Sequence, residues 1–176
     1  MVTLVNISDQ VIGKAGKMKA HQEGLLHRAF SILILNNKKD LLIQKRAFSK
    51  YHSGGLWSNT CCGHPKPSED LKEACHKRLL YEMGFDANLR KLYDFIYRAK
   101  LKNNLIEHEL DHVYGGVVKD DIQIISNPLE VDDFRWISLD YLETDMHINP
   151  HNYTKWFLHI IDFMKEHKGL IKKLFE

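Results

Sequence analysis

Hydrophobic residues along the chain follow two rhythms, and each rhythm predicts a different kind of element. Two apolar runs at residues 29–35 and 41–46 flank the polar segment 36–40, which predicts a β-hairpin. Later runs predict strands at residues 91–98, 109–118 and 134–137, with a turn at 103–104 between the first two. The pattern therefore predicts a sheet with strands from both halves of the chain.

A helical rhythm follows the irregular segment 47–67, which is rich in Gly, Ser and Pro and is long enough to suggest a functional loop. Ser68 is expected to be the N-cap of this helix, with Glu69 and Asp70 in the first turn, and Gly84 is expected to end it. The apolar positions of the helix form one stripe: Leu71, Ala74, Cys75, Leu79 and Met83.

The C-terminal segment 150–174 is predicted to be largely helical, with an interruption near Gly169. Together the elements predict an α+β fold in which helices flank a mixed β-sheet. The sequence contains no internal repeat or linker-like stretch, so residues 1–176 are predicted to form a single domain.

Composition limits the partners of the chain. Hydrophobic residues make up 44% and charged residues 27%, which is ordinary for a soluble globular protein. A net charge of +2 is too small to favour nucleic acid or an anionic membrane surface. The three cysteines include no C-x-x-C pair, and no secretory signal or membrane span is recognisable. We therefore expect a cytoplasmic protein with a small-molecule partner. Its oligomeric state is unknown from the sequence.

The predicted helix carries a spacing of glycines and glutamates that resembles the Nudix box, G-x5-E-x7-R-E-U-x-E-E-x-G-U with U apolar. In Nudix hydrolases this helix projects several glutamates toward a divalent metal that carries a diphosphate. The matching positions are Gly63, Glu69, Leu79, Glu82, Gly84 and Phe85. Lys77-Arg78 replaces the Arg-Glu pair and Tyr81 replaces one glutamate, so only Glu82 of the central carboxylates remains. Because clustered carboxylates hold the metals and activate water, their loss disfavours nucleotide hydrolysis.

Two charge patterns have an ordinary interpretation beside a functional one. Arg78 and Glu82 lie four residues apart on one helix face, which also fits a simple surface ion pair. Glu107 and Glu109 would share one face of a strand, with His108 on the other. Two like charges side by side are unfavourable without a cation or a shared proton, although a solvated edge strand would also tolerate them.

Histidine is unusually frequent, with 11 residues. His21 and His27 flank the start of the first hairpin strand, and His64 precedes the helix. Three imidazoles with two carboxylates can surround one divalent ion such as Mg²⁺, Mn²⁺ or Zn²⁺. Spacing alone does not select these three, because a single histidine is more often an ordinary surface or core residue. No role is assigned to the others: His52, His76, His108, His112, His147, His151, His159 and His167.

Several stretches, in order along nearly the whole chain, resemble the type 1 isopentenyl-diphosphate:dimethylallyl-diphosphate isomerases. They are Gly24-Leu-Leu-His-Arg-Ala-Phe-Ser31, Trp57-Ser-Asn-Thr-Cys-Cys-Gly-His-Pro65, Leu80-Tyr-Glu-Met-Gly84, Tyr97-Arg-Ala99, Glu107-His-Glu109 and Glu130-Val-Asp-Asp-Phe-Arg-Trp136. The resemblance implies a Nudix-like fold. One departure is Ser53-Gly54-Gly55, where the bacterial pattern often has Trp-Pro-Gly; it loosens the loop but leaves the implied ligands in place.

The resemblance implies roles for individual residues. The implied ligands of a divalent ion, Mn²⁺ or Mg²⁺ or else Zn²⁺, are His21, His27, His64, Glu107 and Glu109. Cys62 and Glu109 would form the acid–base pair, with Tyr97 hydrogen-bonded near Glu109 and Cys61 only packing. Glu82 would help to hold a Mg²⁺ that bridges to the diphosphate of the substrate. The implied substrate contacts are Lys17, Arg46, Lys50 and Arg78 around the diphosphate and Trp156 over the hydrocarbon.

The implied reaction is the reversible conversion of isopentenyl diphosphate to dimethylallyl diphosphate through a carbocation. Two groups on opposite faces of the alkene can exchange the roles of proton donor and acceptor, and Cys62 and Glu109 suit this because they come from a loop and a strand. An alternative is a Nudix hydrolase of nucleoside diphosphate derivatives, and a third is an inactive binding module that keeps the fold. The incomplete box and Cys62-Gly-His64 count against the hydrolase.

Overall fold

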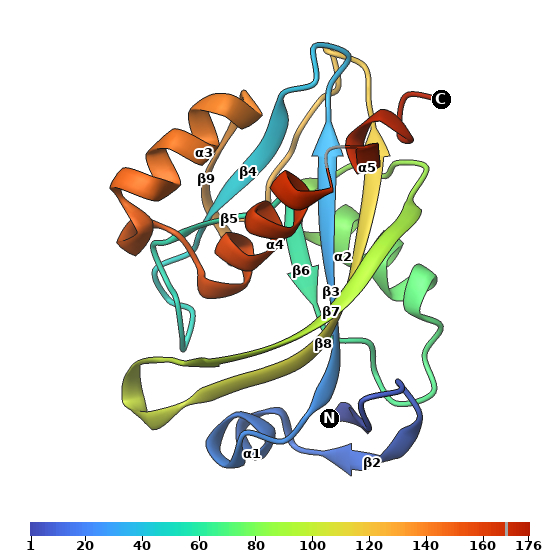
Figure 1. Cartoon of the computed structure of the whole chain (residues 1–176), viewed down its shortest axis with the longest axis vertical. Helices are drawn as coiled ribbons and strands as arrows, with labels where there is room; N and C mark the ends of the chain where they lie inside the picture. The colour runs from blue at the N-terminus through green and yellow to red at the C-terminus, as the bar shows by residue number, and fades with distance from the viewer. Residues whose placement is uncertain (168) are drawn as a thin grey trace.

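A computed structural model describes residues 1–167 and 169–176 of the chain (Figure 1). Its strands are β1 (Val2–Val5), β2 (Val11–Ala15), β3 (His27–Leu35), β4 (Leu41–Arg46), β5 (Trp57–Ser58), β6 (Cys61–Gly63), β7 (Arg90–Lys100), β8 (Ile106–Val117) and β9 (Val131–Ile137). Its helices are α1 (Lys17–Glu23), α2 (Leu71–Met83), α3 (Leu139–Ile148), α4 (Lys155–Glu166) and α5 (Gly169–Lys172), with short 3-10 turns η1 (Lys102–Asn104) and η2 (Pro150–Asn152). The mixed α+β architecture predicted from the sequence is confirmed.

Strand β3 organises the sheet. It pairs in parallel with β8, from His27 opposite Glu109 to Leu35 opposite Val117, and antiparallel with β1, β4 and β6. Strand β8 in turn pairs with β7 as a long antiparallel hairpin, and β4 pairs with β9. The predicted hairpin of β3 and β4 is present, although the two strands pair only beside the turn and then diverge toward different partners.

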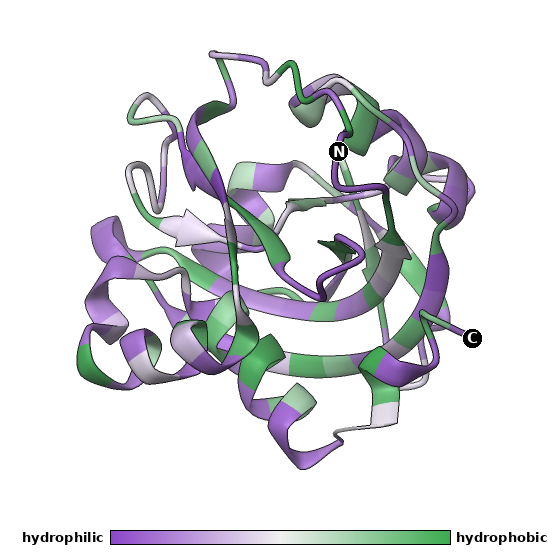
Figure 2. Ribbon diagram, turned by 90° about the horizontal axis from the view of Figure 1, so that it is seen from above, coloured by the Kyte–Doolittle hydropathy of each residue, from purple (hydrophilic) through white to green (hydrophobic). Residues whose placement is uncertain are grey.

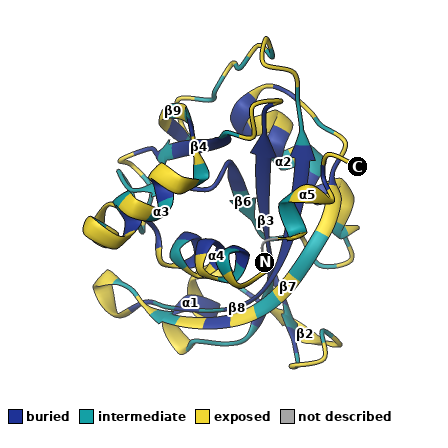
Figure 3. Cartoon of the chain, turned by 45° about the horizontal axis from the view of Figure 1, so that its top comes forward, coloured by how far each residue is buried: buried dark blue, intermediate teal, exposed yellow. Residues whose placement is uncertain are grey.

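Two hydrophobic cores lie on opposite faces of the sheet. Leu33 and Leu35 of β3 pack into the core that α3 and α4 cover, whereas Ile32 and Ile34 pack into the core under α2. Strand β3 is therefore buried on both faces, which explains its continuous apolar run (Figure 3). The long curved ribbons differ, because they mix hydrophilic and hydrophobic residues (Figure 2).

Helix α2 agrees with the predicted stripe, since Ala74, Cys75, Leu79 and Met83 are all buried. Gly84 ends the helix in the left-handed conformation, with φ 76°. The predicted N-cap was wrong. Asp70 occupies that position and accepts a hydrogen bond from the backbone N–H of Glu73 at 2.9 Å.

Ser68 fails as the N-cap because its backbone is left-handed, with φ 67°, whereas an N-cap residue has an extended backbone. Glu69 accordingly lies before the helix, and its carboxylate accepts a hydrogen bond from the N–H of Lys66. The elements predicted from the sequence also did not include β1, β2, β5, β6, α1 and α3. The interruption near Gly169 is confirmed, because α4 ends at Glu166 and α5 begins at Gly169. Within the described part of the chain, no helix is long and apolar enough to span a membrane.

Candidate active site

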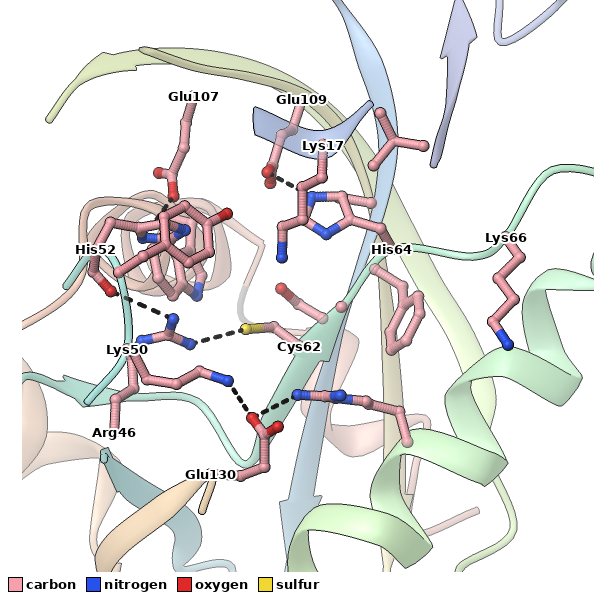
Figure 4. Close-up of a pocket in the computed structure, with 18 of the residues that line it drawn as sticks. Lys17, Arg46, Lys50, His52, Cys62, His64, Lys66, Glu107, Glu109 and Glu130 are labelled. Carbon is pink, nitrogen blue, oxygen red and sulfur yellow. Dashed lines mark hydrogen bonds and ion pairs between the residues drawn. The ribbon is translucent and has the colours of Figure 1, made fainter. Parts of the chain in front are cut away.

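A cavity of about 350 Å³ opens beside β3, β6 and β8, and it brings together most of the residues singled out from the sequence. Figure 4 shows its polarity: Glu107, Glu109 and His64 lie at one end, Lys50 and Glu130 at the other. The predicted residues that line it are Lys17, Arg46, Lys50, Cys62, His64, Arg78, Glu107, Glu109 and Trp156.

The two adjacent cysteines face different environments because β6 is a strand, in which neighbouring side chains alternate. Cys61 is fully buried in the core under α2, whereas Cys62 lines the cavity. The next residue must be small, since a Cβ on Gly63 would lie 2.9 Å from Cζ of Phe30. The short strand therefore presents one thiol to the cavity.

Three histidines converge on Glu109 from separate elements. Nε2 of His64 lies 2.9 Å from Oε1 of Glu109, and Nε2 of His27 lies 3.4 Å from the same oxygen and 3.2 Å from the His64 nitrogen. Nε2 of His21 lies 3.9 Å from that oxygen. These four donor atoms all lie within 4.8 Å of one another. The parallel register of β3 and β8, with His27 opposite Glu109, creates this convergence.

The cluster fits a divalent cation. His21 and His27 each donate Nδ1–H to a backbone carbonyl at 2.8 Å, which leaves each Nε2 as a free lone pair. Nε2 of His21 is buried and has no hydrogen-bond partner among the described residues. Ligand atoms about 2.1 Å from one ion lie roughly 3 Å apart when adjacent and about 4 Å apart when opposite, which matches the spacing found here.

Glu107 belongs to a neighbouring group of possible metal ligands that was not predicted from the sequence. Its carboxylate lies with His21 and His52 in a second set of possible ligands, and Nδ1 of His52 is 3.7 Å from Oε1 of Glu107. His52 was assigned no role, yet it faces the cavity and stacks on the His21 ring at 5.6 Å. No local pattern marks it, because it comes from the irregular segment between β4 and β5.

Tyr97 on β7 links the two glutamates. Its hydroxyl donates to Oε2 of Glu109 at 2.6 Å and lies 3.4 Å from Oε2 of Glu107. Burial raises the pKa of Glu107 well above its ordinary value, and the neighbouring Glu109 charge adds to this. Burial acts on Glu109 in the same direction, but His64 and His27 outweigh it and hold that pKa low. The pKa values of the two neighbouring carboxyls are therefore pushed in opposite directions.

Cys62 is a neutral thiol at physiological pH. Burial raises its pKa to about 12, although Arg46 opposes the shift. The guanidinium Nη1 of Arg46 lies 3.8 Å from Sγ, and the same guanidinium lies over the Trp156 ring, 5.1 Å from its centroid. Trp156 is held in place because its Nε1–H donates to Oδ1 of Asn59 at 3.0 Å. Arg46 thus contacts both the protonated thiol and the face of the aromatic ring.

The Glu130 carboxylate pairs with two of the basic side chains that line the cavity. Glu130 accepts hydrogen bonds from Lys50 and from Arg78, the latter at 2.7 Å. Glu130 begins one of the stretches that carry the resemblance, but the sequence indicated no role for it. Lys66 also lines the cavity, and it was not among the predicted site residues.

Glu82 is not among the residues that line the cavity. Its side chain is buried, and its oxygens accept from Nε of Arg78 at 2.5 Å and from Nε2 of Gln44 at 2.6 Å. The ion pair considered for Arg78 and Glu82 is therefore present, but Glu82 is buried and does not lie at the surface. The alternative of a solvated edge strand for Glu107 and Glu109 is wrong, because both are buried and β8 pairs on both sides.

A further carboxylate lies on the same face of β8. Asp111 is buried and accepts from the hydroxyl of Ser31 at 2.7 Å, and Ser31 lies opposite Cys62 in the pairing of β3 with β6. Burial, with Glu109 nearby, raises the pKa of Asp111 to about 8. Asp111 could have been predicted from the sequence, because alternate residues of a strand share one face and Asp111 follows Glu107 and Glu109 at that spacing.

The fold and this site define a NUDIX domain: the family of that description matches residues 25–157 of the chain. Solved structures with the same fold include DR0079 of Deinococcus radiodurans, at 19% identity, a TM-score of 0.69 and coverage of 84% of this chain and 89% of that one. The MutT protein of Methanosarcina mazei matches at 17% identity and a TM-score of 0.65, over 81% of this chain and 95% of its own.

Curated relatives are more similar. Isopentenyl-diphosphate Delta-isomerase 2 of Photorhabdus laumondii is 51% identical over 92% of this chain and 90% of its own length. The protein of the same name in Aromatoleum aromaticum is 47% identical over 92% of this chain and 84% of its own. The chain belongs to the isopentenyl-diphosphate Delta-isomerase family.

His52 and His64 are expected to destabilise the metal-free protein in acid. Burial lowers the pKa of His64 to about 4 and that of His52 to about 3, against about 6.5 in an unfolded chain. As the pH falls below about 6.5, the unfolded state binds protons that the folded state resists, so unfolding becomes easier. Asp111 and Glu107, whose pKa values are raised, act in the opposite sense, so the histidine contribution is measured as a difference from a variant that lacks both imidazoles. In urea titrations with a chelator present, the unaltered protein should lose a few kcal/mol more of its free energy of unfolding than that variant between about pH 7 and pH 4.

The His52→Gln/His64→Gln double variant is the control for that titration. Glutamine does not titrate, so the pH dependence should become shallower over the same interval. A slope equal to that of the unaltered protein would show that other groups cause the acid sensitivity.

Proposed function

We propose that the chain interconverts isopentenyl diphosphate and dimethylallyl diphosphate by moving a proton. The observation that carries this proposal is one cavity in which the protonated thiol of Cys62 and the ionised carboxylate of Glu109 accompany Trp156 and a set of basic side chains. An acid and a base with pKa values pushed apart are what allylic isomerisation requires. The relatives' printed name supports the same reaction.

In this mechanism the diphosphate binds at the basic end of the cavity, through Lys17, Arg46, Lys50 and Arg78. The thiol of Cys62 gives a proton to C4 of the alkene, which leaves a tertiary carbocation at C3. The Trp156 ring faces that charge, a contact that contributes on the order of 1–2 kcal/mol in a dry site. Glu109 takes the proton from C2, and Tyr97 holds its carboxylate in place. The two groups exchange roles in the reverse direction.

The proposed ligands of a divalent ion are His21, His27, His64, Glu107 and Glu109, and Mn²⁺, Mg²⁺ and Zn²⁺ all suit nitrogen and oxygen donors. When bound, this ion supplies positive charge that keeps Glu109 ionised and fixes its position. A role for Glu82 in holding a diphosphate-bridging Mg²⁺ stays a prediction, because Arg78 and Gln44 occupy its oxygens. The cytoplasmic location also stays a prediction.

Nucleotide hydrolysis has less support. The helix carboxylate that survives from the Nudix pattern, Glu82, is buried and bonded within the protein. The groups that do face the cavity include a thiol, which metal-assisted hydrolysis does not use.

The test is incubation of the metal-loaded protein with isopentenyl diphosphate in deuterated water. Deuterium should appear in dimethylallyl diphosphate, because the added proton comes from a group that exchanges with solvent. A panel of nucleoside diphosphate derivatives serves as the comparison. Release of phosphate or mononucleotide from that panel, without isomer interconversion, would favour the hydrolase, and binding without proton exchange would favour an inactive binding module.

Arg78→Ala is expected to raise KM for isopentenyl diphosphate about tenfold or more, because a charge-assisted contact to the diphosphate is lost. The free energy of unfolding should also fall by roughly 1–3 kcal/mol, because buried Glu82 loses one of its two partners. Steady-state kinetics and urea titration measure the two effects separately. Lys77→Ala, an exposed neighbour on the same helix, should change neither by much. An unchanged KM in Arg78→Ala would remove Arg78 from the substrate site.

A further inference from the structure

A second cavity, of about 480 Å³, lies next to the first and has no part in the proposed reaction. Three separate segments enclose it: the irregular segment 48–56, the tip of the β7–β8 hairpin around 100–103, and the region where η2 leads into α4 (Figure 1). Cavities of this size accommodate small-molecule ligands. The side chains that line it indicate which class of ligand would bind.

Charges of one sign surround this second cavity. Lys50, Lys100, Lys102, Lys155 and His151 line it, and its described lining contains no acidic residue. In the part of the chain that the structure describes, no ion pair forms at Lys100, Lys102 or Lys155. A hollow lined by one sign of charge concentrates its electrostatic potential and attracts counter-ions. The cavity therefore suits an anion of several charges, such as a diphosphate.

Apolar side chains form another part of the wall, beside the polar residues Ser53 and Asn103. Phe48, Leu56, Leu101 and Tyr153 all line the cavity. A ligand with an apolar group attached to its anionic end would satisfy both parts of this lining. A diphosphate ester of a hydrocarbon alcohol has that composition.

The backbone on one side of the cavity is closely packed. A Cβ on Gly54 would lie 2.7 Å from the carbonyl oxygen of Phe48, and one on Gly55, whose φ is 75°, would lie 2.6 Å from Cε1 of the Phe48 ring. Only residues without a side chain allow the segment to fold back this far. Gly54, where the family pattern often has Pro, and Gly55 together shape this wall.

The two cavities share a wall. Lys50, Tyr51 and His52 line both of them. In the first cavity Lys50 donates to Glu130, and the His52 ring contacts Trp156 edge to face at 6.1 Å between ring centroids. An anion in the second cavity would therefore compete for the Lys50 ammonium that the first cavity uses.

We propose that the second cavity is an accessory site for a prenyl diphosphate, and that its occupation weakens binding of substrate in the first cavity through Lys50; the second part rests on the proposed function of the first cavity. Coupling of this kind is reciprocal, so substrate also weakens binding at the accessory site. The affinity of the first cavity for substrate would therefore depend on the concentration of other prenyl diphosphates.

The test uses geranyl diphosphate as the probe and compares three metal-loaded proteins. The first is unaltered, the second carries Lys100→Gln, Lys102→Gln and Lys155→Gln, and the third is a charge-matched control. The control carries Lys14→Gln, Lys72→Gln and Lys119→Gln, which are exposed lysines outside both cavities. By calorimetry, the unaltered and control proteins should bind two equivalents of probe per chain, and the cavity variant should bind one.

Kinetics test the coupling. Without probe, the cavity variant should keep its KM and kcat, because the altered lysines lie outside the first cavity. With probe, KM should rise in the unaltered and control proteins, and the cavity variant should need about tenfold more probe for the same rise, since several modest ionic contacts multiply. One equivalent in the unaltered protein, or equal sensitivity in all three, would overturn the proposal. Inorganic diphosphate binding as tightly as the probe would overturn the assigned ligand class.

Discussion

Cys62→Ala is expected to lower the rate of interconversion by about 10³-fold while the protein remains folded. The alkene is an extremely weak base, so the reaction depends on a firmly placed acid. The Cys62 thiol is the neutral acid on the cavity wall, with Sγ 3.8 Å from Arg46. Alanine removes the proton donor but keeps the backbone of β6. Initial rates with isopentenyl diphosphate, together with circular dichroism spectra, measure the effect.

Cys61→Ala is the matched control for that variant. Cys61 precedes Cys62 in the chain but packs into the core under α2. Its replacement should lower the free energy of unfolding by roughly 1 kcal/mol and leave the rate nearly unchanged. If Cys62→Ala kept full activity, or if both variants lost activity equally, the thiol of Cys62 would have no specific role in proton transfer.

Removing divalent ions with a chelator is expected to abolish activity and to lower the thermal midpoint of the protein. The proposed ligands come from α1, β3, the segment after β6, and β8, so one ion would join four elements. An ion present at about 100 times its dissociation constant stabilises the folded state by about 2.7 kcal/mol. Calorimetric melting curves and initial rates should both recover when Mn²⁺ or Mg²⁺ is restored.

The Glu109→Gln variant tests whether the divalent ion binds at the proposed ligands or elsewhere on the protein. Glutamine is nearly the same size but neutral, so the histidines lose the carboxylate on which they converge. Metal affinity and activity should fall together in this variant. His108→Gln, one residue away on the opposite face of β8, should retain both, because His108 instead bonds the Gly24 carbonyl. Unchanged metal binding in Glu109→Gln would place the ion elsewhere.

Family membership favours the isomerase over the hydrolase that the Nudix frame first suggested. The relatives named isopentenyl-diphosphate Delta-isomerase match over about nine-tenths of the chain at 47–51% identity. The solved structures are under 20% identical and show the fold alone. The loss of helix carboxylates, visible in the sequence, and the engagement of Glu82 by Arg78 and Gln44, visible in the structure, agree with this result.

Features that depend on short-range periodicity could be predicted from the amino-acid sequence. Alternation placed Glu107 and Glu109 on one face of a strand, and the stripe from Leu71 to Met83 with Gly84 placed helix α2. Each of these follows from geometry within about four residues, where backbone dihedral angles fix the direction of side chains. The motifs that carried the resemblance could also be recognised from the sequence, because each is a short run of consecutive residues.

Only the tertiary structure decided which distant groups meet. The register between β3 and β8 puts His27 opposite Glu109, residues that are far apart in the sequence, and the irregular segment after β4 brings His52 against Glu107. Spacing along the chain contains no information about such distances, which depend on strand pairing and on packing of both sheet faces. The N-cap at Asp70 was decided in the same way, by the backbone conformation of the preceding loop.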